Sequence, residues 1–234
     1  MDMDDFQCSI DVVIPVFNGS RTISNAIRSI ESQSFRGKIT IYAVDDYSTD
    51  DSVRVLENLK KDNENLYITK NSKNLGNAVS RNIGSKLGNS PYVSFLDQDD
   101  IWMTNKLELQ IEAANAEPEV GYIVGMQQFK LLNPSIIPRW FNSEWLKSPQ
   151  PGYLPSTLIV RRSILNLIGG FSEDLLIASD TDWFARARRM KIPYTLLPEV
   201  LVEREIHSDN LSASTSSNLD YLKLLRVHLE TENE

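Results

Sequence analysis

The sequence has little of what marks a secreted protein. Cys8 is the single cysteine among 234 residues, so an intrachain disulfide is excluded and a reducing compartment is expected. The first five residues, Met-Asp-Met-Asp-Asp, are acidic and no apolar segment follows them, which is unlike a secretory signal peptide. These absences predict a cytoplasmic location.

Long hydrophobic runs are also absent. The longest candidate, residues 154–171, is interrupted by Arg161 and Arg162, whereas a membrane-spanning helix needs about 20 predominantly apolar residues. We therefore expect no membrane span. Peripheral association with the inner face of the membrane stays open.

An excess of positive charge is the third absence. The chain carries 24 Lys and Arg residues against 32 Asp and Glu residues, which gives a formal net charge of -8. A protein that coats nucleic acid needs a basic face, so no nucleic-acid partner is expected. A phosphorylated substrate would have to be held locally, by a metal ion or by a few placed cations.

The first half of the chain alternates strand-like and helix-like segments. Apolar runs that suit strands occur at residues 10–16, 39–44, 66–69 and 92–96. Amphipathic segments that suit helices follow at residues 23–30, 53–59, 76–87 and 107–114. In the third of these helices we expect Val79, Ile83 and Leu87 to face inward. The alternation predicts an α/β fold with a doubly wound, mostly parallel sheet.

The second half is less regular. From about residue 121 prolines alternate with aromatic residues, and residues 126–155 are expected to form a shaped surface loop. The patch from Trp140 to Trp145 in this loop would either stack on the face of a sugar or only pack. Strands are predicted near residues 157–160 and 200–206, and helices near residues 162–168 and 182–190.

Polar clusters follow three of the first four predicted strands, at Asn18-Gly19, Asp45-Asp46 and Asp97-Gln98-Asp99. The carboxyl ends of parallel strands meet at one edge of a sheet, so these clusters should face one crevice. Carboxylates packed together repel one another unless a cation neutralises them. A turn with helix capping is the alternative for the second cluster, and Asp100 is expected only to lead into the next helix.

Several segments in a fixed order resemble the motifs of family 2 glycosyltransferases. They are residues 12–18 (Val-Val-Ile-Pro-Val-Phe-Asn), 44–50 (Val-Asp-Asp-Tyr-Ser-Thr-Asp), 74–76 with 81–84, and 95–100 (Phe-Leu-Asp-Gln-Asp-Asp), followed by 169–171, 179–182 with Arg186, 204–207 and 210–212. The resemblance covers roughly residues 12–212. It implies one domain over 1–234 with the nucleotide-diphosphosugar transferase (GT-A) fold. The donor half would span 9–125, the acceptor half 126–212 and a C-terminal helical tail 213–234.

The resemblance also implies roles for single residues. Asp180 matches the usual catalytic base, and Asp99 matches the carboxylate that binds the divalent metal, Mn²⁺ or Mg²⁺. Donor-binding positions are Pro15, Phe17, Asp46, Arg81, Asp97 and Asp99, and metal-binding positions are Asp99, Asp97 and His207.

Some of these positions have a second interpretation. Asp180 could cap the helix that follows it, and Asp182 could take its role. Arg81 and Arg186 could pair with carboxylates beneath the site instead of touching phosphate. Ser179 stands where the family usually has an acidic residue before the base, which should leave the pKa of Asp180 less raised.

The function that the resemblance implies is metal-dependent, inverting sugar transfer from a nucleotide diphosphate donor, with UDP-sugars favoured. The acceptor would be a hydroxyl of a glycan, a lipid-linked sugar or a peptide in cell-surface glycan biosynthesis. One carboxylate base suffices to deprotonate that hydroxyl, and direct displacement inverts the anomeric carbon. Tyr47, where the family usually has a small residue, is expected to narrow the donor pocket.

Two other functions compete with this one. A nucleotidyltransferase would need a basic, Gly-rich phosphate loop after the first strand, and residues 17–21 (Phe-Asn-Gly-Ser-Arg) are a poor version. A non-catalytic nucleotide-sugar-binding module would have little reason to keep Asp97, Asp99, Asp180 and His207 together. The tail could pack on the domain, form a homodimer or touch a membrane.

Overall fold

The computed structural model of the protein describes residues 8–133, 137–138, 141–175 and 177–206. The predictions for His207, Trp140 and the tail at 213–234 lie outside these ranges. The described strands form one sheet in the order β3-β2-β1-β4-β8-β6-β9-β5, with β7 beside β6. None of the helices in the described ranges has the length and apolar content needed to cross a bilayer.

The first half of the sheet is parallel, as the alternation predicted. Strand β1 pairs with β2 and β4, and β2 pairs with β3, all in parallel register. The elements are β1 (Ser9–Val16), α1 (Ile23–Glu31), β2 (Lys38–Asp45), α2 (Ser52–Asp62), β3 (Leu66–Lys70), α3 (Asn77–Leu87) and β4 (Tyr92–Phe95).

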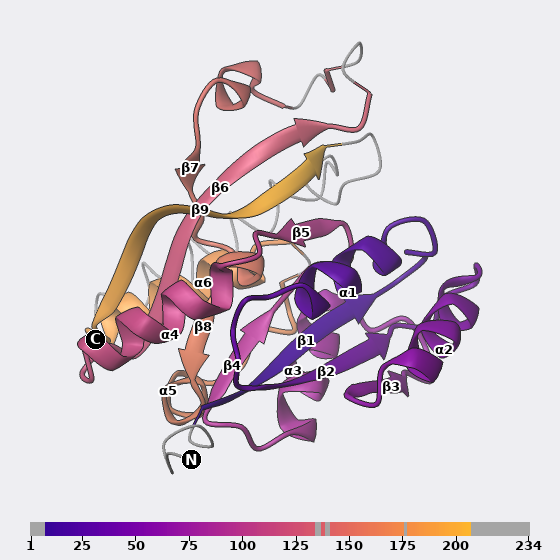
Figure 1. Cartoon of the computed structure of the whole chain (residues 1–234), viewed down its shortest axis with the longest axis horizontal. Coiled ribbons are helices and arrows are strands. Elements are labelled where there is room, and N and C mark those ends of the chain that lie inside the picture. The colour runs from indigo at the N-terminus through magenta and orange to yellow at the C-terminus, as the bar shows by residue number, and fades with distance from the viewer. Residues whose placement is uncertain (1–7, 134–136, 139–140, 176, 207–234) are drawn as a thin grey trace.

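The second half of the sheet is mixed (Figure 1). Strand β8 runs antiparallel to β4 and β6, β9 runs parallel to β6, and β5 runs antiparallel to β9. The elements are β5 (Asp100–Trp102), α4 (Lys106–Ala116), β6 (Tyr122–Leu131), η1 (Ser143–Leu146), β7 (Gln150–Pro151), η2 (Pro155–Thr157), β8 (Ile159–Arg161), α5 (Arg162–Ile168), α6 (Ser179–Arg189) and β9 (Tyr194–Ile206).

Two hydrophobic cores lie on opposite faces of the sheet. On β1, Val12 and Ile14 belong to the core that α1, α2 and α4 cover, whereas Val13 belongs to the core that α3, α5 and α6 cover. Successive side chains of a strand point to opposite faces, so β1 needs apolar residues at consecutive positions. The fold is therefore an α/β fold of the doubly wound kind, with a mixed sheet.

The inward face of α3 was predicted wrongly. Val79 and Ile83 are half-buried and Leu87 is exposed, whereas the polar residues Ser80, Arg81 and Asn82 are buried. The helix lies so close to the sheet that a Cβ on Gly84 would come within 2.3 Å of Val13 Cγ1. The polar side chains are buried because each has a partner outside the helix: Asn71 for Ser80, Asp97 for Arg81 and Phe171 for Asn82. The apolar periodicity does not reveal those partners.

Candidate active site

The ends of β1 and β4 are joined by the side chain of Gln98. Its Oε1 accepts a hydrogen bond from the Phe17 amide at 3.0 Å, and its Nε2 donates to the Phe17 carbonyl at 3.0 Å. A Cβ on Gly19 would lie 2.1 Å from Gln98 Oε1, so a larger residue at position 19 would displace the Gln98 side chain from this contact. The middle residue of the Asp97-Gln98-Asp99 cluster thus fixes the loop that follows β1.

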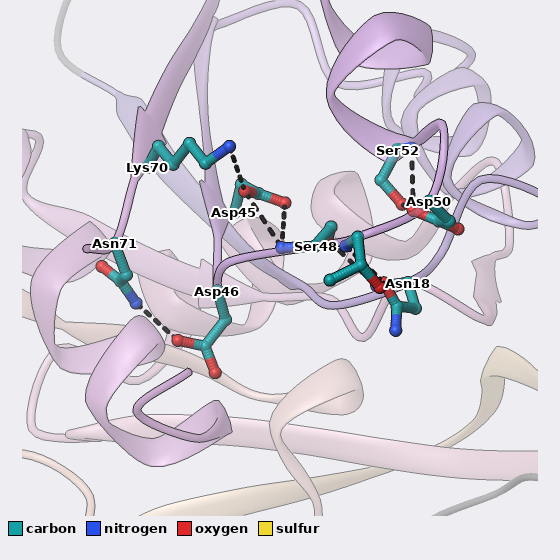
Figure 2. A network of polar contacts seen from close by, with 9 residues as sticks. Asn18, Asp45, Asp46, Ser48, Asp50, Ser52, Lys70 and Asn71 are labelled. Carbon is teal, nitrogen blue, oxygen red and sulfur yellow. Dashed lines mark hydrogen bonds and ion pairs between the residues drawn. The ribbon is translucent and has the colours of Figure 1, made fainter. Parts of the chain in front are cut away.

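The loops after β1 and β2 are interlocked as well (Figure 2). Asn18 Oδ1 accepts from the Thr49 amide at 2.8 Å, and the Asn18 amide donates to Ser48 Oγ at 3.0 Å. The Ser48 amide donates to the buried carboxylate of Asp45 at 3.3 Å, and Lys70 Nζ lies 4.0 Å from that carboxylate. The three polar strand ends therefore meet at one edge of the sheet, as predicted.

Asp46 holds the loop between β3 and α3. Its Oδ1 accepts from Asn71 Nδ2 at 2.7 Å and from the Leu75 amide at 2.8 Å, and its Oδ2 accepts from the Gly76 amide at 2.7 Å. Figure 2 shows the Asn71 side chain reaching toward this carboxylate. Gly76 has a φ of +89°, which favours glycine. Asp46 thus shapes the edge of the crevice through backbone amides, in line with the turn interpretation.

Two exposed aromatic residues stand at this edge. Phe17 is 39% exposed and Tyr47 is 49% exposed, and Lys70 Nζ lies 5.9 Å from the centre of the Tyr47 ring. Tyr47 adopts a φ of +66°, an uncommon conformation for a side chain of its size. Pro15, by contrast, is buried within β1. Of the two predicted donor-binding residues at the end of β1, the structure therefore exposes Phe17 and not Pro15.

Arg81 is paired with the first carboxylate of the cluster. Its Nη2 donates to Asp97 Oδ1 at 2.5 Å, and its guanidinium lies 5.5 Å from the centre of the Phe171 ring. Asn82 fixes the backbone of Phe171. Its side chain donates to the Phe171 carbonyl at 2.9 Å and accepts from the Phe171 amide at 2.8 Å. Arg81 Nε is buried and has no hydrogen-bond partner among the described residues.

A second charged pair lies next to the cluster, on β5 and β9. Arg204 Nε lies 3.5 Å from Asp100 Oδ1, and Ser156 Oγ donates to Asp100 Oδ2 at 2.5 Å. Ser156 Oγ also accepts from the Asp97 amide at 3.1 Å. Burial raises the pKa of the Asp100 carboxyl to about 7, with Arg204 opposing the shift. Asp100 is therefore a buried strand residue and does not simply lead into the next helix.

Sequence reasoning assigned no role to Arg204 or Ser156. Arg204 lies on β9, within one of the segments that resemble the family motifs, but its partner Asp100 is far away in the sequence. Ser156 stands alone in a Pro-rich stretch. Only strand pairing brings these residues together.

Asp180 lies in the first turn of α6 and does not cap it. The helix begins at Ser179 after Ala178, and Asp180 Oδ1 accepts from the adjacent Thr181 amide at 2.8 Å. Burial raises the pKa of the Asp180 carboxyl. The charges of Arg81 and Arg204 oppose this shift.

The negative charge of Asp97 adds to the rise in the pKa of Asp180. Asp180 is thus within electrostatic reach of the β4 end of the sheet, although many residues separate them in the chain.

Asp182 and Arg186 have a different task. Arg186 Nε donates to Asp182 Oδ2 at 2.7 Å. Its two terminal nitrogens donate to the carbonyls of Ile168 and Gly170, both at 2.7 Å. Arg186 therefore holds the turn after α5. This agrees with the interpretation that Arg186 pairs with a carboxylate instead of touching phosphate. Asp182 is engaged there and is a poorer candidate for the base than Asp180.

The donor chemistry of the crevice suits a hard divalent cation. Asp97 and Asp99 supply carboxylate oxygens at the end of β4, and Mg²⁺ in enzymes is commonly held by one or two carboxylates together with phosphates of the substrate. Within the described residues no group of three or more His, Cys, Asp or Glu side chains forms a metal site by itself. The residues present thus fit an ion that a bound diphosphate helps to hold.

Comparison with protein families gives one match over most of the chain. The family model described as "Glycosyl transferase family 2" matches residues 11–171. One relative, the UDP-Glc:alpha-D-GlcNAc-diphosphoundecaprenol beta-1,3-glucosyltransferase WfgD of Escherichia coli, is 29% identical over 170 residues, which cover 70% of this chain and 64% of the relative. The aligned part of the chain corresponds to between 14% and 64% of the length of curated relatives.

Solved structures share the fold. S. aureus TarS 1-349 in complex with UDP-GlcNAc gives a TM-score of 0.69 at 22% identity, covering 94% of this chain and 65% of that one. The mannosyltransferase PcManGT from Pyrobaculum calidifontis, in complex with GDP-Man and Mn²⁺, gives a TM-score of 0.65 at 17% identity and covers 86% of this chain and 57% of that one. The predicted GT-A architecture is thereby confirmed.

Proposed function

The chain belongs to glycosyl transferase family 2, and from this premise we propose that it transfers a sugar from a UDP-sugar to a hydroxyl of a lipid-linked sugar, with inversion at the anomeric carbon. The observation that carries the proposal is the position of Asp180. Its carboxyl has a raised pKa and lies within electrostatic reach of Arg81, Arg204 and Asp97. A carboxylate near a cluster that suits a metal diphosphate is the arrangement that such a transfer needs.

The nature of the donor is inferred from the relatives. The WfgD relative is named for a UDP-glucose donor and a lipid-diphosphate acceptor, and TarS was solved with UDP-GlcNAc. We assign residues 9–125 to donor binding and residues 126–212 to acceptor binding. Phe17, Tyr47 and the loop that Asp46 holds would contact the nucleoside. Transfer to a lipid-linked sugar would take place at the cytoplasmic face of a membrane.

Charge neutralisation is the main task of the donor half. Asp97 and Asp99 would hold Mn²⁺ or Mg²⁺, with His207 as a third predicted ligand. The ion would supply Lewis-acid stabilisation of the leaving diphosphate. Arg204 adds a positive charge beside the same cluster. Arg81 neutralises Asp97, so that fewer negative charges oppose the incoming diphosphate.

The acceptor hydroxyl would lose its proton to Asp180. Desolvation of this partly buried carboxyl raises its pKa, and a stronger base accepts a proton more readily. With Asp180 acting as a base on the hydroxyl, the hydroxyl attacks the anomeric carbon directly and the configuration inverts.

A screen of UDP-, GDP- and dTDP-sugars with Mn²⁺ tests the proposal. UDP should bind in the presence of Mn²⁺ by calorimetry, and one UDP-sugar should be hydrolysed or transferred. NMR of the product should show the anomeric configuration opposite to that of the donor. Tight binding of GDP alone, or a product with retained configuration, would contradict the proposal.

A further inference from the structure

A row of three side chains leads from the carboxylate cluster toward an aromatic patch. Asp100 on β5 is the register partner of Arg204 on β9, and Arg204 is the register partner of Phe129 on β6. Cross-strand partners point to the same face of a sheet. The Arg204 guanidinium lies 5.9 Å from the centre of the Phe129 ring. The charged crevice is therefore continuous with the ring of Phe129.

Phe129 supports a second ring that faces solvent. Trp145 stacks on Phe129 with ring centres 5.8 Å apart and planes 23° apart, while Phe141 meets both rings edge to face. Phe141 is buried, but Trp145 is 43% exposed. One side of the Trp145 ring is thus held by Phe129 and the residue remains accessible.

The backbone holds Trp145 in place. It lies in η1, where the Asn142 side chain accepts from the Glu144 amide at 3.1 Å and the Trp145 amide donates to the Asn142 carbonyl at 3.1 Å. Lys147 Nζ lies 2.8 Å from Glu144 Oε1 across the same turn. A ring that is ordered before binding loses less conformational freedom when a ligand docks.

We propose that Trp145, backed by Phe129, is the platform on which the pyranose ring of the acceptor stacks; the inference rests on the proposed function. A pyranose presents one face of C–H bonds and an edge of hydroxyl groups. The aromatic face of Trp145 suits the C–H face of the sugar, since aromatic rings bury large apolar areas in defined geometry. Gln127, on the same face of β6 as Phe129, is largely buried and its Nε2 donates to the Pro151 carbonyl at 3.2 Å, so its Oε1 is the atom that can accept a hydrogen bond from a hydroxyl. Its Oε1 lies 3.5 Å from Arg204 Nη1.

A sugar ring fits this surface better than a lipid chain does. The guanidinium of Arg204 and the amide of Gln127 contact each other and border the platform, and a hydroxyl edge can add hydrogen bonds to them, whereas an alkyl chain cannot. Arg204 also influences the pKa of Asp180. The row of Asp100, Arg204 and Phe129 joins the platform to the crevice, so a pyranose on Trp145 would lie beside that crevice.

Tyr67 provides a matched control. It stacks on Tyr42 with ring centres 5.6 Å apart and planes 27° apart, and it is 51% exposed. It lies on β3, at the opposite end of the strand order from β6 and β9. Tyr67→Leu thus removes a comparable stacked ring that is remote from the proposed platform.

The test uses methyl N-acetyl-α-D-glucosaminide, methyl α-D-glucoside and decyl phosphate as probes in saturation-transfer NMR with the full chain. Trp145→Ala should weaken the binding of a pyranoside about tenfold, in line with the worth of an aromatic contact, and Trp145→Phe should weaken it less. Tyr67→Leu should leave it unchanged. Mn²⁺-dependent UDP affinity should stay the same in the Trp145 variants, and a cooperative thermal transition should show that they are folded, although loss of the stack on Phe129 lowers the melting temperature of Trp145→Ala.

Three results would overturn the platform. They are unchanged pyranoside contacts in Trp145→Ala, equal weakening by Tyr67→Leu, and a loss confined to decyl phosphate, which would identify a lipid site. UDP binding is measured separately, so failure of the donor assignment is recognised independently: a wild-type chain that ignores UDP but binds pyranosides through Trp145 would contradict the proposed function and not the platform.

Discussion

Arg81, which is buried, and Asp97, which is partly exposed, form an ion pair at 2.5 Å that joins α3 to the end of β4. The pair explains why α3 turns a polar face inward. It also places a positive charge where Asp180 responds to it. The first prediction concerns this charge.

Arg81→Met should move the acidic limb of the activity profile to higher pH. The base must be ionised to act, so activity falls as pH drops through the pKa of Asp180. Burial raises that pKa and Arg81 lowers it, so removing Arg81 raises it further. The limb is measured from kcat/KM against pH. Arg54→Met, at an exposed surface pair with Asp51, is the control and should leave the limb in place.

Asp180→Asn should abolish transfer while leaving Mn²⁺-dependent UDP affinity nearly unchanged. Loss of a general base typically costs about 10²- to 10⁴-fold in rate. Asp182→Asn breaks the contact with Arg186. This variant should lower the melting temperature and should keep most of the transfer activity that Asp180→Asn loses. If Asp180→Asn lost UDP binding and stability together, Asp180 would be structural.

Asp100→Asn should flatten the pH dependence of stability between about pH 4 and 7. Burial raises the pKa of Asp100 to about 7, above its unfolded value of about 4. The folded protein therefore holds a proton that the unfolded chain releases, and stability falls as pH rises through this window, by at most about 1.4 kcal/mol per pH unit.

Urea unfolding of the wild type and Asp100→Asn at several pH values tests this. The difference between the two should grow in favour of the variant as pH rises. A constant difference would show that Asp100 is ionised in the fold throughout.

Lys106→Met should remove a slope in stability at alkaline pH. Lys106 is fully buried, with Nζ 2.8 Å from Gln110 Oε1, 3.1 Å from Ser94 Oγ and 4.0 Å from the centre of the Trp102 ring. Burial holds its pKa well below the usual value. At a pH between the folded and unfolded pKa values, Lys106 is protonated in the unfolded chain and neutral in the folded protein. The folded state therefore loses stability as pH falls from about 10.5 toward the folded pKa.

Unfolding by urea between neutral and alkaline pH measures this slope. Lys60→Met, at an exposed position on α2, should keep it. An identical slope in wild type and Lys106→Met would place the titration in another group.

Gly19→Ala should destabilise the protein and weaken UDP binding. The new Cβ would meet Gln98 Oε1 at 2.1 Å and break the two bonds between Gln98 and Phe17. Overpacking of this kind costs about 1–3 kcal/mol. Thermal unfolding measures the first effect. Gly19→Ala with Gln98→Ala should regain stability relative to Gly19→Ala alone, because the clash is relieved; no recovery would point to backbone strain instead.

Much of the first half of the fold could be predicted from the sequence. The apolar runs at 10–16 and 39–44 became β1 and β2, and the polar residues that follow them meet at one edge of the sheet. These features are local, because the spacing of apolar residues along a strand or helix is visible in neighbouring residues of the sequence. The order of the family motifs added the GT-A architecture and the candidates Asp97, Asp99 and Asp180. The roles of these residues, and that of His207, stay predictions.

The tertiary structure decided what depends on partners far away in the chain. Strand β5 forms only by pairing with β9, and this pairing sets Arg204 between Asp100 and Phe129. The face that α3 buries follows from hydrogen bonds to Asp97 and Phe171, which the apolar periodicity cannot show. The sequence by itself determined which chemical groups the strand ends carry. Folding decided which of those groups are paired, which are buried and which remain to meet a substrate, because burial and pairing depend on contacts between residues distant in sequence.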